Sequence, residues 1–160
     1  MFEKGIIVTD AIAQNTQTVS LTIRNIPVCP IVYPNDLEQI KRKEEAFLAY
    51  AWADYLNSED HDPLLLPILP MVKGAYKSLQ ATKQYLKRER IANIESFNVL
   101  GASKRGWTAL SMATTNCTTC EVKINSVGGL VPLMPDLRKE IHEQLEAYGG
   151  FSFAFIDYLN

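Results

Sequence analysis

Residues 97–110 carry the feature that most constrains the fold, an apolar run followed by a glycine-flanked serine and then a helical pattern. The run at 97–100 is typical of a short buried strand, and the residues after the serine have the spacing of a helix. Ser103 would then lie at the apex of a tight strand-to-helix turn, between Gly101 and Gly106. Such a turn presents a serine at the edge of a parallel sheet, because the helix must cross over to a neighbouring strand.

The remaining hydrophobic pattern alternates between strand-like and helix-like segments. It predicts strands at 18–23, 97–100 and 123–133, and helices at 37–57, 67–88, 104–115 and 137–148. Prolines make 24–36 a loop, and residues 6–13 fit either the end of a helix or a short strand. Because strands that alternate with amphipathic helices form parallel sheets, the predicted fold class is α/β, a mainly parallel sheet flanked by helices.

Composition and charge exclude several classes of function. The chain has 160 residues, enough for one domain, and its net charge of −2 provides no basic field for nucleic acid. No apolar run approaches the roughly 18–20 residues of a membrane-spanning helix, and the N-terminus lacks the long apolar stretch of a signal peptide. No sequence pattern indicates a cofactor. We therefore expect a domain that binds no nucleic acid and spans no membrane, with a localisation that the sequence leaves open.

The three cysteines do not form a complete disulfide framework, because their number is odd. Cys117 and Cys120 have the spacing of half a zinc site or of a redox pair, but a structural zinc needs two further cysteine or histidine ligands. The histidines of the chain are His61 and His142. We therefore expect no metal site and a cysteine pair that is structural or incidental, with a local disulfide as the alternative.

Ser103 has two interpretations, a nucleophile and a helix cap. A serine at the apex of such a turn is strained, and glycines at 101 and 106 remove the clash with neighbouring backbone. The following helix directs its N-terminal amides, beginning with that of Lys104, towards an oxyanion. The spacing Gly-x-Ser-x-x-Gly nevertheless has its second glycine one position later than the usual motif, with Arg105 where glycine is expected. The alternative is a serine that only caps the helix.

A serine nucleophile needs a histidine base and an acid that orients it, and neither is evident in the sequence. In α/β-hydrolases the acid and then the histidine follow the serine along the chain. His142 lies among glutamates in a predicted helix, as expected for a solvated face, and His61 precedes the serine in a polar loop. Asp136 follows a predicted strand and is a candidate acid, although we favour it as the cap of the helix at 137–148.

Several segments, in the same order along the chain, resemble the PhoPQ-activated pathogenicity-related protein family. They comprise residues 24–30, 43–52, 69–75, 101–108, 131–137 and 148–154, and the resemblance covers most of residues 11–158. The family is similar to α/β-hydrolases, so the resemblance implies a three-layer α/β-hydrolase-like fold. It further implies that Ser103 is the nucleophile, that the Lys104 backbone amide is an oxyanion donor, and that Asp136 matches an aspartate of the family pattern.

The resemblance also implies that residues 1–160 are a single, truncated α/β-hydrolase domain with the central strands, the central helices and the nucleophile turn. The family's glycine-rich loop, which carries the second oxyanion donor, has no counterpart here. We therefore expect a fragment or degenerate member of a serine hydrolase of esterase or peptidase type. Its substrate would be a small ester or peptide, and the chain would be inactive by itself because no catalytic histidine is evident.

Two other functions remain open. The family includes the autocrine proliferation repressor proteins of amoebae, which implies as one alternative a non-catalytic, secreted signalling protein that binds a cell-surface receptor. A secreted location is implied by the family alone. The other alternative is an α/β domain without an active site, in which Ser103 only caps a helix.

Overall fold

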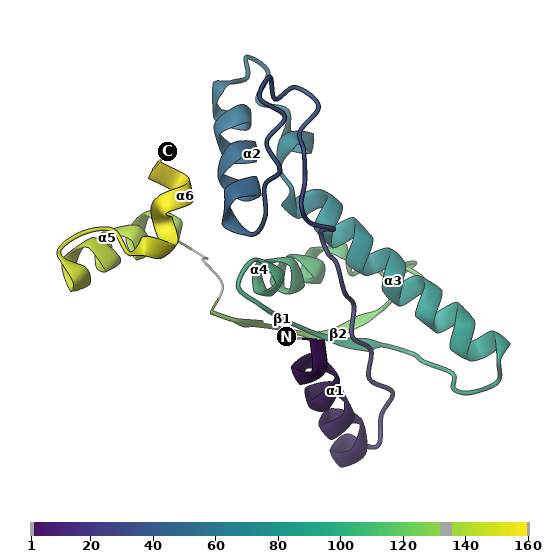
Figure 1. Ribbon diagram of the computed structural model, residues 1–160. Coiled ribbons are helices and arrows are strands. Elements are labelled where there is room, and N and C mark those ends of the chain that lie inside the picture. Colours follow the sequence, from purple (N-terminus) through teal and green to yellow (C-terminus); the bar gives the residue numbers. More distant parts are fainter. Residues whose placement is uncertain (1, 132–135, 160) are drawn as a thin grey trace.

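The computed structural model describes residues 2–131 and 136–159, and helices surround two parallel strands (Figure 1). The helices are α1 (Phe2–Thr16), α2 (Glu45–Asn57), α3 (Ile68–Arg88), α4 (Lys104–Ser111), α5 (Leu137–Tyr148) and α6 (Ile156–Leu159), and the strands are β1 (Phe97–Ala102) and β2 (Ile124–Leu130). Short 3-10 turns lie at Pro63–Leu65, Met112–Thr115 and Phe153–Phe155. The predicted α/β class is confirmed. The described residues contain a two-stranded sheet, so the three-layer hydrolase arrangement stays a prediction.

The unit β1–α4–β2 holds the Ser103 turn. The two strands pair in parallel, with Gly101 opposite Gly129 and Ala102 opposite Leu130 at the end next to the turn. Parallel strands need a crossover connection, and α4 provides it while packing against both strands. Figure 1 shows α4 and α1 on opposite sides of the sheet. The predicted strand, turn and crossover helix are therefore present in this order.

Two clusters of buried hydrophobic side chains hold the helices in place. The first joins α3 to the strands and includes Leu79 and Met112. The second joins α2 to α3 and includes Phe47 and Met71. Because the second cluster fixes α2 beside α3, it also sets the position of the N-terminal end of α2, which contributes to the site described below.

The helix predicted at 37–57 begins only at Glu45, so the prediction was wrong for its first part. Asp36 organises that part into a loop, because its carboxylate accepts the Ile40 N–H at 2.9 Å. It also pairs with Arg42, whose hydrogen bond holds the pKa of that carboxyl below its usual range. Such local side-chain bonds compete with the helical hydrogen-bond pattern, and here they delay the start of α2.

The strand predicted at 18–23 has no regular secondary structure and no strand partner among the described residues, so this prediction was wrong. Ile23 packs against the cluster around Leu79, and the Thr22 hydroxyl lies 3.1 Å from that of Thr9 in α1. Alternating β-branched residues favour an extended backbone, but a strand also needs a neighbour to complete its hydrogen bonds. The pattern at 18–23 carried no information about that neighbour.

The other predicted elements were confirmed with small changes at their ends. The segments predicted at 67–88, 104–115 and 137–148 correspond to α3, to α4 with the 3-10 turn after it, and to α5. Residues 6–13 lie within α1, which decides between the two options in favour of a helix. The strand predicted at 123–133 is β2, and residues 132 and 133 fall outside the described part. Gly149 ends α5 in the left-handed region at φ 65°.

Cys117 and Cys120 form a disulfide bond with a Cα separation of 5.1 Å, which is the alternative that the sequence left open. Cys29 is a free thiol. Within residues 2–131 and 136–159, no group of three or more His, Cys, Asp or Glu side chains is arranged to hold a metal ion. In the same part of the chain, none of the helices has the length and apolar character that crossing a membrane requires.

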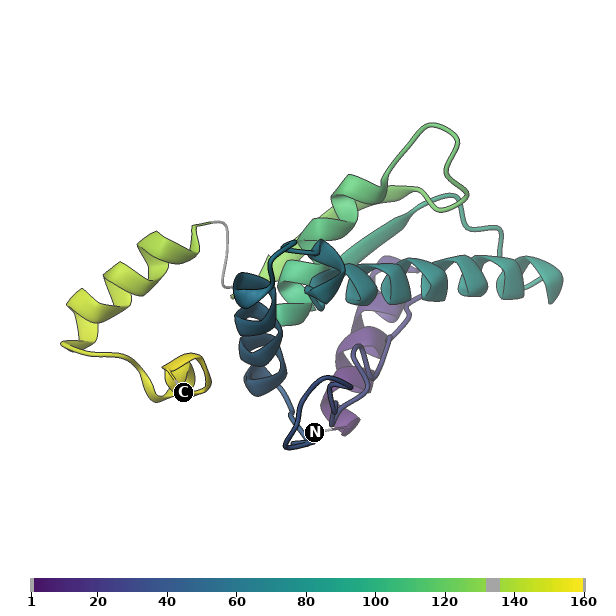
Figure 2. The same ribbon diagram turned by 90° about the horizontal axis from the view of Figure 1, so that it is seen from above.

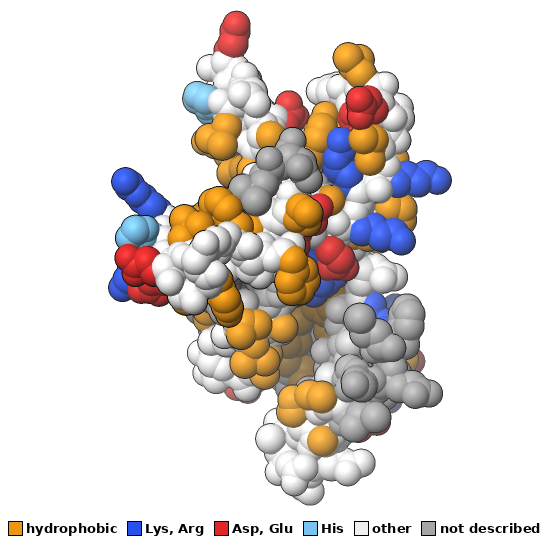
Figure 3. Space-filling model, turned by 60° about the vertical axis from the view of Figure 1, so that its left-hand side comes forward, with side chains coloured by type: hydrophobic (Ala, Val, Ile, Leu, Met, Phe, Trp, Pro, Cys, Tyr) orange, Lys and Arg blue, Asp and Glu red, His pale blue; other side chains and the backbone are white. Residues whose placement is uncertain are grey.

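The C-terminal elements extend to one side of the molecule. Figure 2 shows α5 pointing away from the strands and α6 turning back towards α2, with which α6 is in contact. The chain around α6 exposes large apolar side chains, including Phe151, Phe153 and Ile156. Figure 3 views the molecule with the side of α5 and α6 turned forward, and it shows hydrophobic side chains interspersed with charged ones on this face. Through its contact with α2, α6 brings Tyr158 to the site.

Candidate functional site

Ser103 occupies a strained turn between β1 and α4. Its backbone has φ 54° and ψ −131°, a conformation that costs a non-glycine residue on the order of 1–3 kcal/mol. The Ser103 N–H donates to the Leu130 carbonyl at 2.9 Å, and the Ser103 carbonyl accepts the Trp107 N–H at 3.0 Å. The residue is exposed, and its side chain makes no capping hydrogen bond with α4. Ser103 therefore holds the N-cap position of α4 without using its hydroxyl as a cap.

Gly101 and Gly106 allow the backbone segments of the turn to approach one another. A Cβ on Gly101 would lie 2.1 Å from the Arg105 carbonyl oxygen. A Cβ on Gly106 would lie 3.1 Å from the Gly101 oxygen and 3.2 Å from the Leu130 oxygen. The close approach falls on Gly106, whereas the Arg105 side chain stays 42% exposed. The turn therefore needs a missing Cβ at Gly101 above all, and the second close approach falls at Gly106 rather than at Arg105.

The first amides of α4 directly follow Ser103 in the chain. Trp107 donates the first backbone bond of the helix, to Ser103, so the N–H groups of Lys104, Arg105 and Gly106 have no acceptor within the helix. These groups carry the positive end of the helix dipole. They are chemically suited to stabilise an oxyanion, and the role of the Lys104 amide in doing so stays a prediction.

The Lys104 side chain is buried, at 3% exposure, and forms ion pairs with two consecutive glutamates. Its Nζ pairs with Glu44 and donates to Glu45 Oε1 at 2.9 Å. Arg105 adds a contact of 3.7 Å to Glu44. The hydrogen bond from Lys104 lowers the pKa of the Glu44 carboxyl, which keeps it charged at neutral pH. Because both glutamates stand at the start of α2, these pairs join α2 to the Ser103 turn.

Tyr158 brings α6 into the same network. Its hydroxyl donates to Glu45 Oε2 at 3.3 Å, so Glu45 accepts from Lys104 with one oxygen and from Tyr158 with the other. Burial, reinforced by the charge of Glu45, raises the pKa of the Tyr158 phenol. The phenol therefore remains a protonated donor at neutral pH.

A small cavity with aromatic and charged walls lies beside Ser103. Its volume is about 30 Å³, room for about one water molecule. The Trp52 ring lies 5.8 Å from the Trp107 ring, edge to face, and 5.5 Å from the Tyr158 ring. Besides Ser103, the cavity is lined by Glu45, Leu48, Trp52, Lys104, Trp107 and Tyr158. Ser103 is therefore an exposed residue that borders a cavity lined by three aromatic rings.

Neither histidine lines this cavity. His61 Nδ1 lies 2.9 Å from the Tyr55 carbonyl oxygen, in the loop after α2. His142 Nε2 lies 3.2 Å from a Glu146 carboxylate oxygen on the exposed face of α5. The expectation that His142 belongs to a solvated face is confirmed, and no imidazole accompanies Ser103.

Asp136 caps α5, because its carboxylate accepts the Lys139 N–H at 3.0 Å. The residue is exposed and is not among those that line the cavity. The helix-cap interpretation, which the sequence favoured, is confirmed by this bond. A role of Asp136 as catalytic acid has no contact at the Ser103 cavity to support it.

Replacing Asp136 tests its role as a helix cap. We expect Asp136→Ala to lower the stability of the α5 segment by about 1 kcal/mol, whereas Asp136→Asn changes it by a few tenths, because asparagine is an equally good N-cap. Urea unfolding followed by circular dichroism measures both changes. Equal losses in the two variants would mean that the charge of Asp136, rather than its cap, matters.

Sequence reasoning did not assign Glu44, Glu45, Trp52 or Tyr158 to the site. Acidic residues at a helix start are usually explained by the helix dipole, so the glutamates gave no distinct signal. The bond between Glu45 and Lys104 spans 59 residues, which no local pattern records. The sequence offered only a weak signal for this ion pair. A lysine next to Ser103 would need an acidic partner if its side chain were buried.

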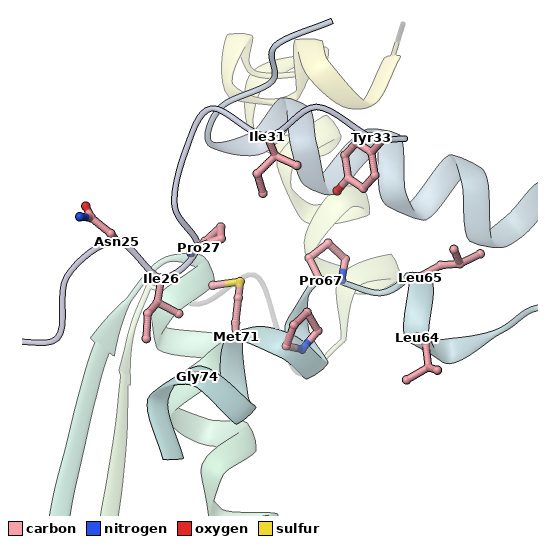
Figure 4. Close-up of a pocket in the computed structure, with 11 residues that line it drawn as sticks. Asn25, Ile26, Pro27, Ile31, Tyr33, Leu64, Leu65, Pro67, Met71 and Gly74 are labelled. Atoms are coloured by element: carbon pink, nitrogen blue, oxygen red, sulfur yellow. The ribbon is translucent and has the colours of Figure 1, made fainter. Parts of the chain in front are cut away.

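A larger, apolar cavity lies between the loop before α2 and the start of α3 (Figure 4). Its volume is about 400 Å³, and its walls include Ile26, Pro27, Ile31, Tyr33, Pro67 and Met71. The Tyr33 hydroxyl donates to the Phe47 carbonyl at 2.8 Å, and burial raises its pKa to about 12. None of the described residues that line this cavity is a carboxylate, a histidine or a cysteine.

Comparisons with known proteins give one family and one curated relative. The family model of PhoPQ-activated pathogenicity-related proteins matches residues 3–160. Autocrine proliferation repressor protein A of Dictyostelium discoideum is 32% identical over 149 residues, which cover 93% of this chain and 28% of that protein. The chain thus spans less than a third of the length of this relative. No solved structure matches the chain. Because the family model matches nearly its whole length, the chain belongs to the PhoPQ-activated pathogenicity-related protein family.

Proposed function

We propose that Ser103 is the nucleophile of a serine-hydrolase site of esterase or peptidase type, and that residues 1–160 by themselves do not turn over a substrate. The observation that carries the proposal is the turn itself, in which an exposed serine with a strained backbone precedes α4 without capping it. A serine that served only as a cap would spend its hydroxyl on an amide of the helix.

In the proposed reaction, the Ser103 Oγ attacks the carbonyl carbon of an ester or amide, and the carbonyl oxygen gains negative charge. The amides at the start of α4, beginning with Lys104, would stabilise that charge. The Ser103 proton must pass to a base, and neither histidine of the chain lines the cavity. The base, the acid that orients it and a second oxyanion donor would therefore have to come from outside these residues. The substrate class is a small ester or a peptide.

Labelling with a fluorophosphonate probe tests the proposal, because the probe reacts with serines activated by a base. We expect an adduct at Ser103 when these residues are expressed with the sequence that flanks them in their gene, and none at residues 1–160 alone. Peptide mass spectrometry locates the adduct. Ser103→Ala should abolish it, and Ser111→Ala, at the far end of α4, is the matched control that should leave it unchanged.

Equal labelling of the wild type and Ser103→Ala would contradict the nucleophile. Rapid labelling of Ser103 in residues 1–160 alone would contradict the second half of the proposal, since a base would then lie within this chain.

A second candidate function is repression of cell proliferation without catalysis, by binding a cell-surface receptor. It is favoured by the name of the relative, an autocrine proliferation repressor, and would require secretion. Growth of cells treated with purified wild type or Ser103→Ala separates the two candidates. Equal repression by both proteins supports a binding role, whereas loss of repression in a folded Ser103→Ala protein contradicts it.

A further inference from the structure

We propose that Lys104, Glu44, Glu45 and Tyr158 form a clamp that positions the Ser103 turn for reaction, and we call this set the Lys104 clamp. Its importance for reactivity rests on the proposed function, whereas its existence as a positioning device does not. In this proposal Lys104 is a positioning residue through its side chain, in addition to the predicted role of its backbone amide.

The first argument is the burial of a charge. The Lys104 side chain is 3% exposed, and a buried ammonium is unfavourable unless it is paired and hydrogen-bonded. Its two partners, Glu44 and Glu45, are 59% and 31% exposed, so they approach it from the solvent side. The two carboxylates at the start of α2 therefore bind the buried lysine that follows Ser103. A methionine of similar length would fill the same space, so packing alone does not account for a charge there.

The second argument is the strain of the backbone that the clamp connects. Ser103 has φ 54° and ψ −131°, and Glu44 has nearly the same conformation, φ 48° and ψ −119°. Both are the residues that precede a helix, and Lys104 joins them. Strained conformations persist when their surroundings over-determine them. An ion pair between the two turns restrains each against relaxation of the other.

The third argument is that the clamp holds three helices to one point. Lys104 begins α4, Glu45 begins α2, and Tyr158 lies in α6. Next to this polar contact, the Trp52 ring packs on Trp107 and on Tyr158. The walls of the cavity beside Ser103 thus come from elements that the clamp joins. Because Lys104 supplies both the ammonium and the first amide of α4, restraining its side chain also restrains the orientation of that amide.

The two tryptophans of the chain report on the clamp directly, because Trp52 and Trp107 both line the cavity. We expect Lys104→Met, in residues 1–160, to change the near-ultraviolet circular dichroism and the tryptophan fluorescence at temperatures below the unfolding transition. Exchange of the Ser103 and Trp107 amide hydrogens, which are bonded to the Leu130 and Ser103 carbonyls, should accelerate at least tenfold, while amides in the middle of α3 keep their rates. Lys139→Met, which removes an exposed ion pair on α5, is the matched control.

Glu44→Gln provides a second variant if Lys104→Met does not fold, since it keeps the shape and removes one charge. It also gives a pH test. Because Lys104 lowers the pKa of Glu44, the clamp is complete above the usual carboxyl range and is lost as the pH falls through that lowered value. The charged and titratable groups that face Glu44 and its partners are Glu45, Arg105 and Tyr158, besides Lys104. The tryptophan signal of the wild type should therefore titrate at acid pH, and Glu44→Gln should reduce the amplitude of that titration, since it leaves the Glu45 carboxylate in place.

Two outcomes would overturn the proposal. One is an unchanged tryptophan signal and unchanged amide exchange in folded Lys104→Met. The other is a Ser103 adduct in the flanked protein that forms at the wild-type rate in Lys104→Met, where we expect at least a tenfold loss. If the wild type forms no adduct at all, the proposed function fails, and the spectroscopic and exchange measurements on residues 1–160 still decide whether the clamp exists.

Discussion

Gly101→Ala lowers the free energy of unfolding by about 3 kcal/mol and disrupts the Ser103 turn. The physical reason is a clash with backbone, since the new Cβ would lie 2.1 Å from the Arg105 carbonyl oxygen, 2.5 Å from its carbonyl carbon and 2.9 Å from the Gly106 nitrogen. None of these atoms can rotate away, so β1 and the start of α4 must separate. Overpacking of this kind typically costs about 1–3 kcal/mol, and we expect about 3 kcal/mol because the clash is with backbone atoms.

Urea unfolding followed by circular dichroism measures this loss. Gly74→Ala is the matched control, because its Cβ would lie 3.6 Å from the Ile26 side chain, an ordinary contact, in the middle of α3. Alanine is favoured over glycine there, so we expect a gain of about 0.5–1 kcal/mol. A Gly101→Ala protein with wild-type stability would contradict this prediction and show that the turn relaxes around the added Cβ.

Phe47→Ala lowers the free energy of unfolding by about 4 kcal/mol, the usual cost of emptying a fully buried aromatic site. The Phe47 side chain has 0% exposure and forms a cluster with Leu48 and Met71. This cluster fixes α2 against α3. Loss of the ring should therefore also weaken the approach of the acidic start of α2 to Lys104.

Thermal and urea unfolding measure the loss, and tryptophan fluorescence reports the change at the site. Leu56→Ala is the matched control in the same helix, because that side chain is 68% exposed and its removal should change stability by less than about 0.5 kcal/mol. Equal losses in both variants would contradict the inference that the buried cluster, rather than the helix propensity of α2, holds α2 in place.

The departure of this turn from the usual motif spacing has a structural explanation. In Gly-x-Ser-x-x-Gly, the residue that approaches the strand backbone is Gly106, and Arg105 is turned outwards far enough to stay 42% exposed and to contact Glu44. The spacing thus places a second cation near the acidic start of α2. A motif search that requires glycine at 105 would miss a turn of this kind.

Much of the local structure could be predicted from the sequence, because it depends on neighbours along the chain. The apolar run at 97–100, the flanking glycines and the helical spacing after Ser103 predicted strand, turn and helix in the right order. Asp136 likewise marked the start of α5 correctly. Caps, tight turns and helical periodicity are set by interactions within a few residues.

The two wrong predictions have different physical causes. One is a strand partner that the structure does not provide, and the other is a set of side-chain hydrogen bonds that compete with the helix. Residues 18–23 alternate like a strand, but no strand among the described residues pairs with them. The start of α2 was placed too early because the carboxylate of Asp36 binds the Ile40 amide and Arg42 instead of allowing a helix. Hydrophobic periodicity does not register either effect.

At Ser103, the sequence determines the local turn and the tertiary structure determines the partners of Lys104. The chain sequence alone indicates a serine on a sharp strand-to-helix turn, since the requirement for small residues beside a strained backbone is local. Only the tertiary structure reveals that Lys104 is buried against Glu44 and Glu45, with Tyr158 from the far end of the chain. A buried charge must find its partners in space, and those partners come from whichever helices the hydrophobic core brings together.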